Sequence, residues 1–119
     1  MSNDSLAVLN QRLKAFAQSR DWEQFHSPKN LSMALIAEAA ELVEHFQWLT
    51  EEQSYNLPDN KHDEVAMEMA DILTFLIRCA ERLDIDLIAA ANKKIEINEQ
   101  RYPADKVRGD ARRAAEYED

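Results

Sequence analysis

Residues 31–49 read LSMALIAEAAELVEHFQWL, and this stretch predicts a helix whose apolar stripe carries acids. At about 100° per residue, one side of that helix collects the large apolar side chains. They are Leu31, Leu35, Leu42, Phe46 and Leu49. Glu38 falls in the middle of this stripe, and Glu41 lies at its edge, one turn further on. Two carboxylates where a helix normally faces a core are costly to desolvate and repel each other, so we expect a positive charge between them.

The same pattern recurs in Glu68-Met69-Ala70-Asp71, inside a second helix predicted over residues 61–83. The apolar stripe of this helix consists of Val65, Met69, Ile72, Leu73 and Leu76. Glu68 and Asp71 flank one side of that stripe. Two helices that each carry a carboxylate pair at i, i+3 can bring four acidic groups to one point. We expect that point to hold a divalent cation.

The ligand chemistry favours a hard cation. Oxygen ligands alone select Mg²⁺ or Mn²⁺ over zinc, and all four candidate ligands are carboxylates. The competing hypothesis is a di-iron helix bundle, which needs a Glu-x-x-His motif on each of two helices. The chain has that motif once, at residues 23–26, in a predicted connection. A single acidic pair is common on solvated helices, but two pairs beside apolar stripes favour a metal site over a solvated surface. The single Glu-x-x-His motif favours magnesium over a di-iron centre.

The composition favours helices and excludes several classes of function. The 119 residues include one Gly and three Pro, and no alternating β-branched run competes with the helical periodicity. The formal net charge of −9 argues against a nucleic-acid polymer as partner, which needs a basic face. The lone cysteine, Cys79, fits a reduced thiol in the cytoplasm. We find neither an export signal nor an apolar run long enough to span a membrane.

Two further helices complete an expected four-helix bundle. A narrow apolar stripe predicts a first helix over residues 6–19. Residues 20–26 then form a connection that we expect to fold its two aromatics and its histidine back on the core. A fourth helix, capped by Asp84 or Asp86, extends to Arg101. The fold class is therefore all-α.

Capping residues mark the ends of the second helix. Ser27 followed by Pro28 is a start signal, with the serine as N-cap and the proline in the first turn. The apolar pattern carries this helix to about Trp48. Thr50, with Gln53 three residues later, then predicts a capping box that opens a short helical turn.

The third helix is apolar over an unusually wide arc. The residues that widen its stripe are Ala66, Met67, Ala70 and Phe75. A four-helix protomer of this length is too small to cover such an arc alone, so we predict a homo-oligomer that assembles through the second and third helices. Residues 1–103 should form the helical domain. Residues 104–119 should form a mobile tail, or a short helix packed on a partner subunit.

The acidic motifs and their surroundings resemble a known family. The signature E-x-x-E, a spacer and E-x-x-D is that of the MazG-like all-α nucleoside triphosphate pyrophosphohydrolases, and residues 38–41 and 68–71 match it. The segments that resemble the dCTP pyrophosphatase-like branch are residues 20–26 (RDWEQFH), 41–48 (ELVEHFQW) and 97–103 (INEQRYP). The likeness covers residues from about 6 to 103.

The resemblance implies hydrolysis of a (deoxy)nucleoside triphosphate to the monophosphate and pyrophosphate. The substrate would be dCTP or a related dNTP, and the biological role would be nucleotide-pool sanitation. The implied metal ligands, for Mg²⁺ or Mn²⁺, are Glu38, Glu41, Glu68 and Asp71. Glu41 would also take the proton from the attacking water.

Seven residues are assigned to the substrate by the same resemblance. They are Trp22, Trp48, Phe75, Lys94, Asn98, Arg101 and Tyr102. The two tryptophans would enclose the base, the lysine and the arginine would bind phosphate oxygens, and the asparagine and the tyrosine would contact base, sugar or phosphate. Phe75 departs from the mammalian relatives, which have a tyrosine there, so one hydroxyl that could read dCTP is missing. The alternative role for both tryptophans is packing at an interface.

The resemblance also implies a tetramer, built as a dimer of dimers, with nucleotide sites completed across subunits. Two other functions stay open. One is a dUTP-directed hydrolase of the same superfamily. The other is a non-catalytic helical module that binds a nucleotide or a protein and keeps the acidic site as a relic. The preferred base and sugar and the number of metal ions are not fixed by the sequence.

Overall fold

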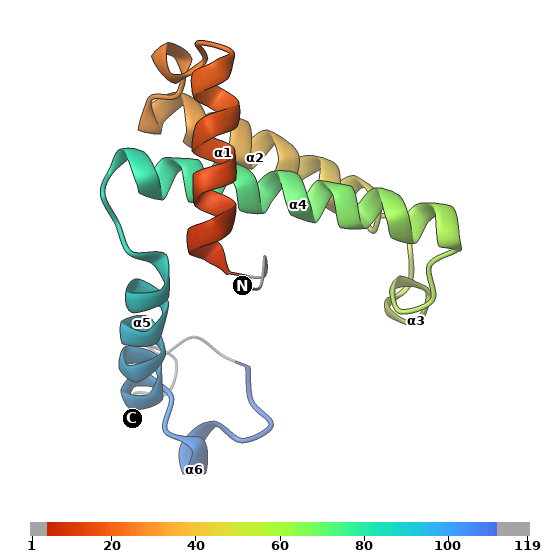
Figure 1. The fold of residues 1–119 in the computed structure, drawn as a ribbon. Coiled ribbons are helices and arrows are strands. Elements are labelled where there is room, and N and C mark those ends of the chain that lie inside the picture. Colours follow the sequence, from red (N-terminus) through yellow and green to blue (C-terminus); the bar gives the residue numbers. More distant parts are fainter. Residues whose placement is uncertain (1–4, 112–119) are drawn as a thin grey trace. The chain divides into compact units, whose positions relative to one another are not determined.

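Helices make up all the regular structure of residues 5–111, the part of the chain that the computed structural model describes. In chain order the elements are α1 (Leu6–Ser19), the 3-10 helix η1 (Glu23–Phe25), α2 (Pro28–Glu44), α3 (Glu51–Ser54), α4 (Asp59–Arg82), α5 (Leu87–Arg101) and α6 (Ala104–Val107) (Figure 1). The predicted all-α class is confirmed. The four long helices agree with the four that the sequence predicts.

The chain divides into two units, one that ends at Ile85 and one that begins at Asp86. The first contains α1 to α4 and the second contains α5 and α6. The predicted packing of four helices into one bundle therefore stays a prediction. Of the predicted tail, residues 104–111 contain the short helix α6, and residues 112–119 lie outside the described residues.

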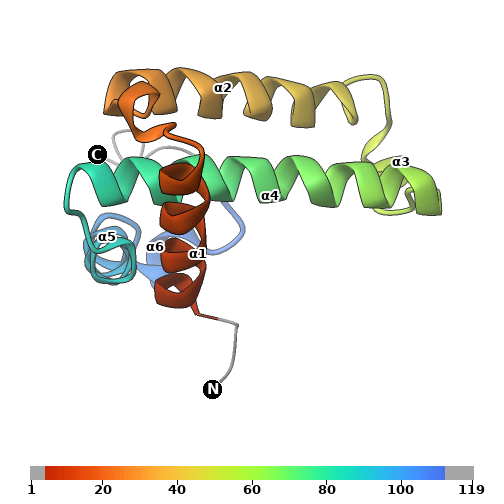
Figure 2. The same cartoon turned by 45° about the horizontal axis from the view of Figure 1, so that its top comes forward.

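The first unit is organised by α2 and α4, which run antiparallel and side by side (Figure 2). Its buried apolar residues are Ala17 of α1, Leu31 of α2, and Val65, Ile77 and Ala80 of α4. Helix α1 packs across α4 (Figures 1 and 2). A polar contact joins these two helices, because Asn10 Nδ2 donates to Glu81 Oε2 at 2.8 Å and Lys14 Nζ lies 3.3 Å from Glu81 Oε1.

The predicted caps are present at three helix starts. Ser27 Oγ accepts a hydrogen bond from Asn30 N at 3.1 Å at the start of α2. Thr50 and Gln53 form both bonds of the capping box at α3. Asp86, rather than Asp84, caps α5 by accepting from Ala89 N at 3.0 Å.

The end of α2 differs from the prediction. The helix ends at Glu44 rather than near Trp48. The backbone bonds change there from i−4 to i−3 partners, since His45 N donates to the Leu42 carbonyl and Phe46 N to the Val43 carbonyl. The apolar periodicity continues through these turns, but the helix does not.

Large apolar side chains remain exposed on both α2 and α4. On α2 they are Met33, Ile36 and Val43, and on α4 they are Met67, Met69, Leu73 and Leu76. This exposure agrees with the wide apolar arc expected from the sequence. None of the helices in residues 5–111 combines the length and the hydropathy that a membrane crossing requires.

Candidate functional site

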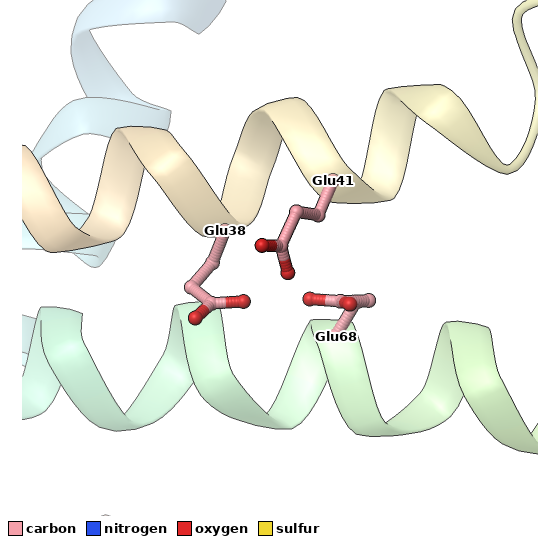
Figure 3. A group of neighbouring side chains, drawn as sticks. All are labelled: Glu38, Glu41 and Glu68. Atoms are coloured by element: carbon pink, nitrogen blue, oxygen red, sulfur yellow. The ribbon is translucent and has the colours of Figure 1, made fainter.

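Three carboxylates point toward one another in the space between α2 and α4 (Figure 3). Glu38 and Glu41 come from α2, and Glu68 comes from α4. One oxygen of each lies within 4.8 Å of the others. Glu38 and Glu68 are half-buried, while Glu41 is exposed. We call these three residues the carboxylate cluster. In residues 5–111 it is the one group of three or more His, Cys, Asp or Glu side chains close enough to share a metal ion.

Two oxygens of the carboxylate cluster lack the partner that burial demands. Glu38 Oε2 and Glu68 Oε2 are buried, and as ionised acceptors they have no donor among the described residues. No Lys, Arg or His of residues 5–111 forms an ion pair with a member of the cluster. Lys61 Nζ and His45 Nδ1 instead lie 3.3 Å and 3.9 Å from Glu64 Oε2. Because buried charge needs compensation, the geometry suits a cation between the helices.

The pKa values of Glu38 and Glu68 reflect the lack of a positive charge in the cluster. A proton shared with the Glu68 carboxylate raises the pKa of Glu38 to about 7, and burial and the nearby Glu41 add to the rise. The pKa of Glu68 is raised as well. Sharing a proton with Glu38 lowers it, but burial and the negative charges of Glu41 and Asp71 outweigh that effect. The raised pKa values favour one proton shared between the two glutamates below about pH 7 when no metal ion is bound.

Asp71, the fourth predicted ligand, lies beside the cluster rather than within it. It is exposed on α4, one turn after Glu68, and is not among the groups within 4.8 Å of one another. Its negative charge still raises the pKa of both Glu38 and Glu68. The structure thus brings three of the four predicted ligands together and leaves the fourth at their edge.

The three aromatic candidates of the first unit lie on different elements. Trp22 precedes η1 and is 45% exposed, and its ring meets Phe16 edge-on with centroids 5.7 Å apart. Trp48 lies in the turns after α2 and is 87% exposed. Phe75 is half-buried on α4, one turn beyond Asp71. The exposed rings of Trp22 and Trp48 are available to a base or to a partner surface.

The remaining four candidates belong to the second unit. Lys94, Asn98 and Arg101 follow one another at i, i+4 and i+7 along α5, so they share a face of that helix. Tyr102 caps α5 through a bond from its N–H to the Asn98 carbonyl at 2.8 Å, and the Arg101 guanidinium carbon lies 5.6 Å from its ring centroid. Their approach to the carboxylate cluster is a prediction from the resemblance.

A second polar group was missed by sequence reasoning. Arg78 of α4 is only 3% exposed, its Nε donates to His26 Nδ1 at 3.4 Å, and its Nη2 lies 3.5 Å from Glu23 Oε1. The next arginine on the same helix face, Arg82, donates from Nε to the His26 carbonyl at 3.1 Å. Glu23 and His26, the two defining residues of the Glu-x-x-His motif at residues 23–26, thus both contact Arg78. The sequence signal that could have indicated this group is Arg78 itself, a cation directly after the apolar run of residues 72–77.

Comparison with known proteins gives a family and several relatives. The model of the MazG-like family matches residues 34–116. The chain is 41% identical over 103 residues to human dCTP pyrophosphatase 1 and 43% identical over 98 residues to its mouse counterpart. These matches cover 85% and 81% of this chain but 61% and 58% of the relatives, so the chain spans only part of their length.

A solved structure is similar as well. The crystal structure of a pyrophosphatase from Archaeoglobus fulgidus aligns with a TM-score of 0.76 at 36% identity. The alignment covers 80% of this chain and 89% of that protein.

Proposed function

The chain belongs to the MazG-like family, and from this membership we propose that it hydrolyses a nucleoside triphosphate to the monophosphate and pyrophosphate. The observation that carries the proposal is the carboxylate cluster, with two buried oxygens that have no donor in the described residues. A structural cluster of acids would be expected to find cationic partners within the fold. This one is suited to a metal and a substrate that arrive from outside.

The cluster fits a hard divalent cation, and we propose Mg²⁺, with Mn²⁺ as the alternative. Glu38, Glu41 and Glu68 offer only oxygen ligands, and Asp71 is placed to join them. When bound, such a cation neutralises phosphate charge and makes a coordinated water more acidic. Ionised Glu38 and Glu68 would then no longer need to share a proton.

Glu41 has the role of general base in this proposal. It is the exposed member of the cluster, so its second oxygen can reach a water that enters from solvent. Its position one turn after Glu38 keeps that oxygen close to the site where the triphosphate would be held. The half-buried pair Glu38 and Glu68 is less accessible to an incoming water.

The substrate we propose is dCTP or a related dNTP. The relatives named as dCTP pyrophosphatases support this choice, as do the exposed rings of Trp22 and Trp48, either of which can stack on a base. Phe75 carries no hydroxyl, so it can pack against a base or sugar but cannot read a base edge. From α5, Lys94 and Arg101 would bind phosphate oxygens, and Asn98 and Tyr102 would contact base, sugar or phosphate.

The proposed biological setting is the nucleotide pool of the cytoplasm, with a homo-oligomer as the working form. The exposed apolar stripes of α2 and α4 support an assembly through these helices, and a tetramer is the proposed size. Subunits packed in this way would bring further residues to each carboxylate cluster.

Product analysis tests the function directly. The purified protein is incubated with Mg²⁺ and with dCTP, dATP, dGTP, dTTP or dUTP in turn, and we expect monophosphate and pyrophosphate from one or two of them. Turnover of dUTP alone would favour the dUTP-directed alternative. If no dNTP turns over, and calorimetry detects no binding of a non-hydrolysable dNTP with Mg²⁺, the proposal is wrong and a protein-binding module replaces it.

A matched pair of variants tests the assignment of Glu41. Glu41→Gln keeps the shape of the side chain and removes its charge, so we expect turnover to fall by about 100-fold or more. Glu44→Gln makes the same change one turn further along α2, at an exposed carboxylate outside the cluster, and should leave turnover unchanged. Equal activity of the Glu41→Gln variant and the wild type would refute the role.

A further inference from the structure

Arg78 is a buried cation whose hydrogen bond and ion pair both go to the connection between α1 and α2. We define the η1 connection as residues 20–26, which include Trp22 and η1. We propose that Arg78 is a positioning residue that fixes the η1 connection on α4 and thereby holds Trp22 in place for the base of the substrate. The role of Trp22 in this inference depends on the proposed function. The contact between Arg78 and the connection does not.

The geometry around Arg78 indicates that this residue positions the η1 connection more than it stabilises the fold. Its Nη1 and Nη2 atoms are buried without a hydrogen-bond partner in the described residues, and the ion pair to Glu23 is long at 3.5 Å. A buried guanidinium with five donors and so few acceptors gains little net free energy, because desolvation offsets the attraction. Glu23 is the more exposed partner and can be hydrated on its own. The pair therefore restricts where the connection lies more than it stabilises the fold.

The bond between Arg78 and His26 requires a neutral imidazole. His26 Nδ1 can accept the bond from Arg78 Nε only when the imidazole is neutral, with its proton on Nε2. Burial first, and then the charges of Arg78 and Arg82, lower the pKa of His26, while Glu23 opposes them. Arg82 binds the backbone carbonyl of the same residue. Two arginines one turn apart thus contact the side chain and the main chain of His26.

Trp22 is restrained from both sides of the η1 connection. Its backbone N–H donates to the Ala17 carbonyl at 2.9 Å, and its ring meets Phe16. The Arg20 guanidinium carbon also lies 3.6 Å from the Phe16 ring centroid. These contacts attach Trp22 to α1. The adjacent residue, Glu23, attaches it to α4 through Arg78. If the contact between Glu23 and Arg78 is lost, the Trp22 ring should be able to reorient about its contacts with α1.

Arg78 lies on the same face of α4 as Glu68 of the carboxylate cluster. Glu68, Asp71, Phe75, Arg78 and Arg82 follow one another at intervals of three and four residues, so they share a face of the helix. Arg78 lies ten residues beyond Glu68, which is about 15 Å along the axis. At that distance Arg78 acts on the position of Trp22 and not on the reacting phosphate. Substrate affinity should respond to its loss, and the chemical step should not.

The test compares Arg78→Met with Arg12→Met, which makes the same change at an exposed arginine of α1. We expect Arg78→Met to raise KM for the preferred dNTP about tenfold, with kcat within about twofold of wild type. Glu23→Gln should act in the same direction. Arg78→Lys keeps the charge, and its KM should fall between those of wild type and Arg78→Met. Arg12→Met should change neither parameter.

Fluorescence gives a readout that does not require turnover. Trp22 and Trp48 are the two tryptophans of the chain, so Trp48→Phe leaves Trp22 as the single emitter. In this background Arg78→Met should make Trp22 more accessible to acrylamide, and Arg12→Met should not. If wild type hydrolyses no dNTP, the proposed function fails while the quenching still decides whether Arg78 holds Trp22. Unchanged quenching, or a lower Tm with KM unchanged, would overturn the inference.

Discussion

Glu38 of α2 and Glu68 of α4 face each other across the helix pair, each with a buried oxygen that has no donor in the described residues. Their helices bring two acids together in a place where one would already be costly. A shared proton relieves the repulsion in the metal-free protein, and a divalent cation would relieve it better. Proton and metal therefore compete for the same oxygens, and this competition can be measured.

Mg²⁺ should stabilise the protein more at pH 8 than at pH 5.5. The pKa of Glu38 is raised to about 7, above its ordinary value, so its contribution to stability is fully present below about pH 4.5 and is lost as the pH rises through 7. A cation replaces that loss, and at about 100 times its Kd it adds about 2.7 kcal/mol to the free energy of unfolding. Thermal melts with and without millimolar Mg²⁺ at both pH values give the comparison. Equal shifts, or none, would count against a metal at this pair.

Glu68→Gln should make the metal-free protein more stable and the enzyme less active. The carboxamide keeps the size of the side chain, removes one negative charge and can donate to the buried Glu38 oxygen. We expect Tm at pH 8 without metal to rise by about 2 to 5 °C, the Mg²⁺ shift to shrink, and turnover to fall by about 100-fold or more. Calorimetry and product analysis on one preparation measure all three. A drop in Tm along with activity would instead mean that Glu68 supports the fold.

Glu81 should make stability depend on pH with the opposite sign. The hydrogen bond from Asn10 and the nearby Lys14 hold its pKa below the ordinary value. A depressed carboxyl pKa stabilises the fold above about pH 4.5, and that contribution is lost as the pH falls through the folded value. Glu81→Gln should therefore cost about 1 kcal/mol at pH 7 and less in acid.

Urea titrations at pH 7 and pH 3.5 measure the effect of Glu81→Gln on the free energy of unfolding. Glu99→Gln, at an exposed carboxylate of α5, is the matched control and should change little at either pH. An equal loss at the two pH values would mean that the contact acts by packing and not by charge.

Much of the fold and part of the site follow from local sequence signals. The helix starts at Ser27, Thr50 and Asp86 could be predicted because a cap is a bond between residues only three apart. The approach of Glu38 to Glu68 follows from their positions in and beside apolar stripes, since two helices that pack along part of such stripes bring these residues together.

The features that the sequence did not reveal depend on distant or fine contacts. The end of α2 at Glu44 reflects a change of backbone bonding that leaves the apolar periodicity intact. The position of Asp71 beside the cluster depends on the direction of one exposed side chain. Arg78 is buried and bonds to His26, 52 positions earlier in the chain. Periodicity describes the face of a helix, but it does not identify the segment that covers that face.

A charge on the exposed apolar stripe of α4 should weaken the proposed assembly. Leu73 lies between Met69 and Leu76 at helical spacing, all three are exposed, and burying them against a second copy would remove their contact with water. Leu73→Glu should lower the mass seen by sedimentation toward the 13.8 kDa of one chain, while Leu83→Glu, at an exposed leucine outside α4, should not. A wild type that sediments as one chain at every concentration would refute the assembly. Because subunits are proposed to complete one another's sites, Leu73→Glu should also lose turnover even though Leu73 is not among the candidate ligands.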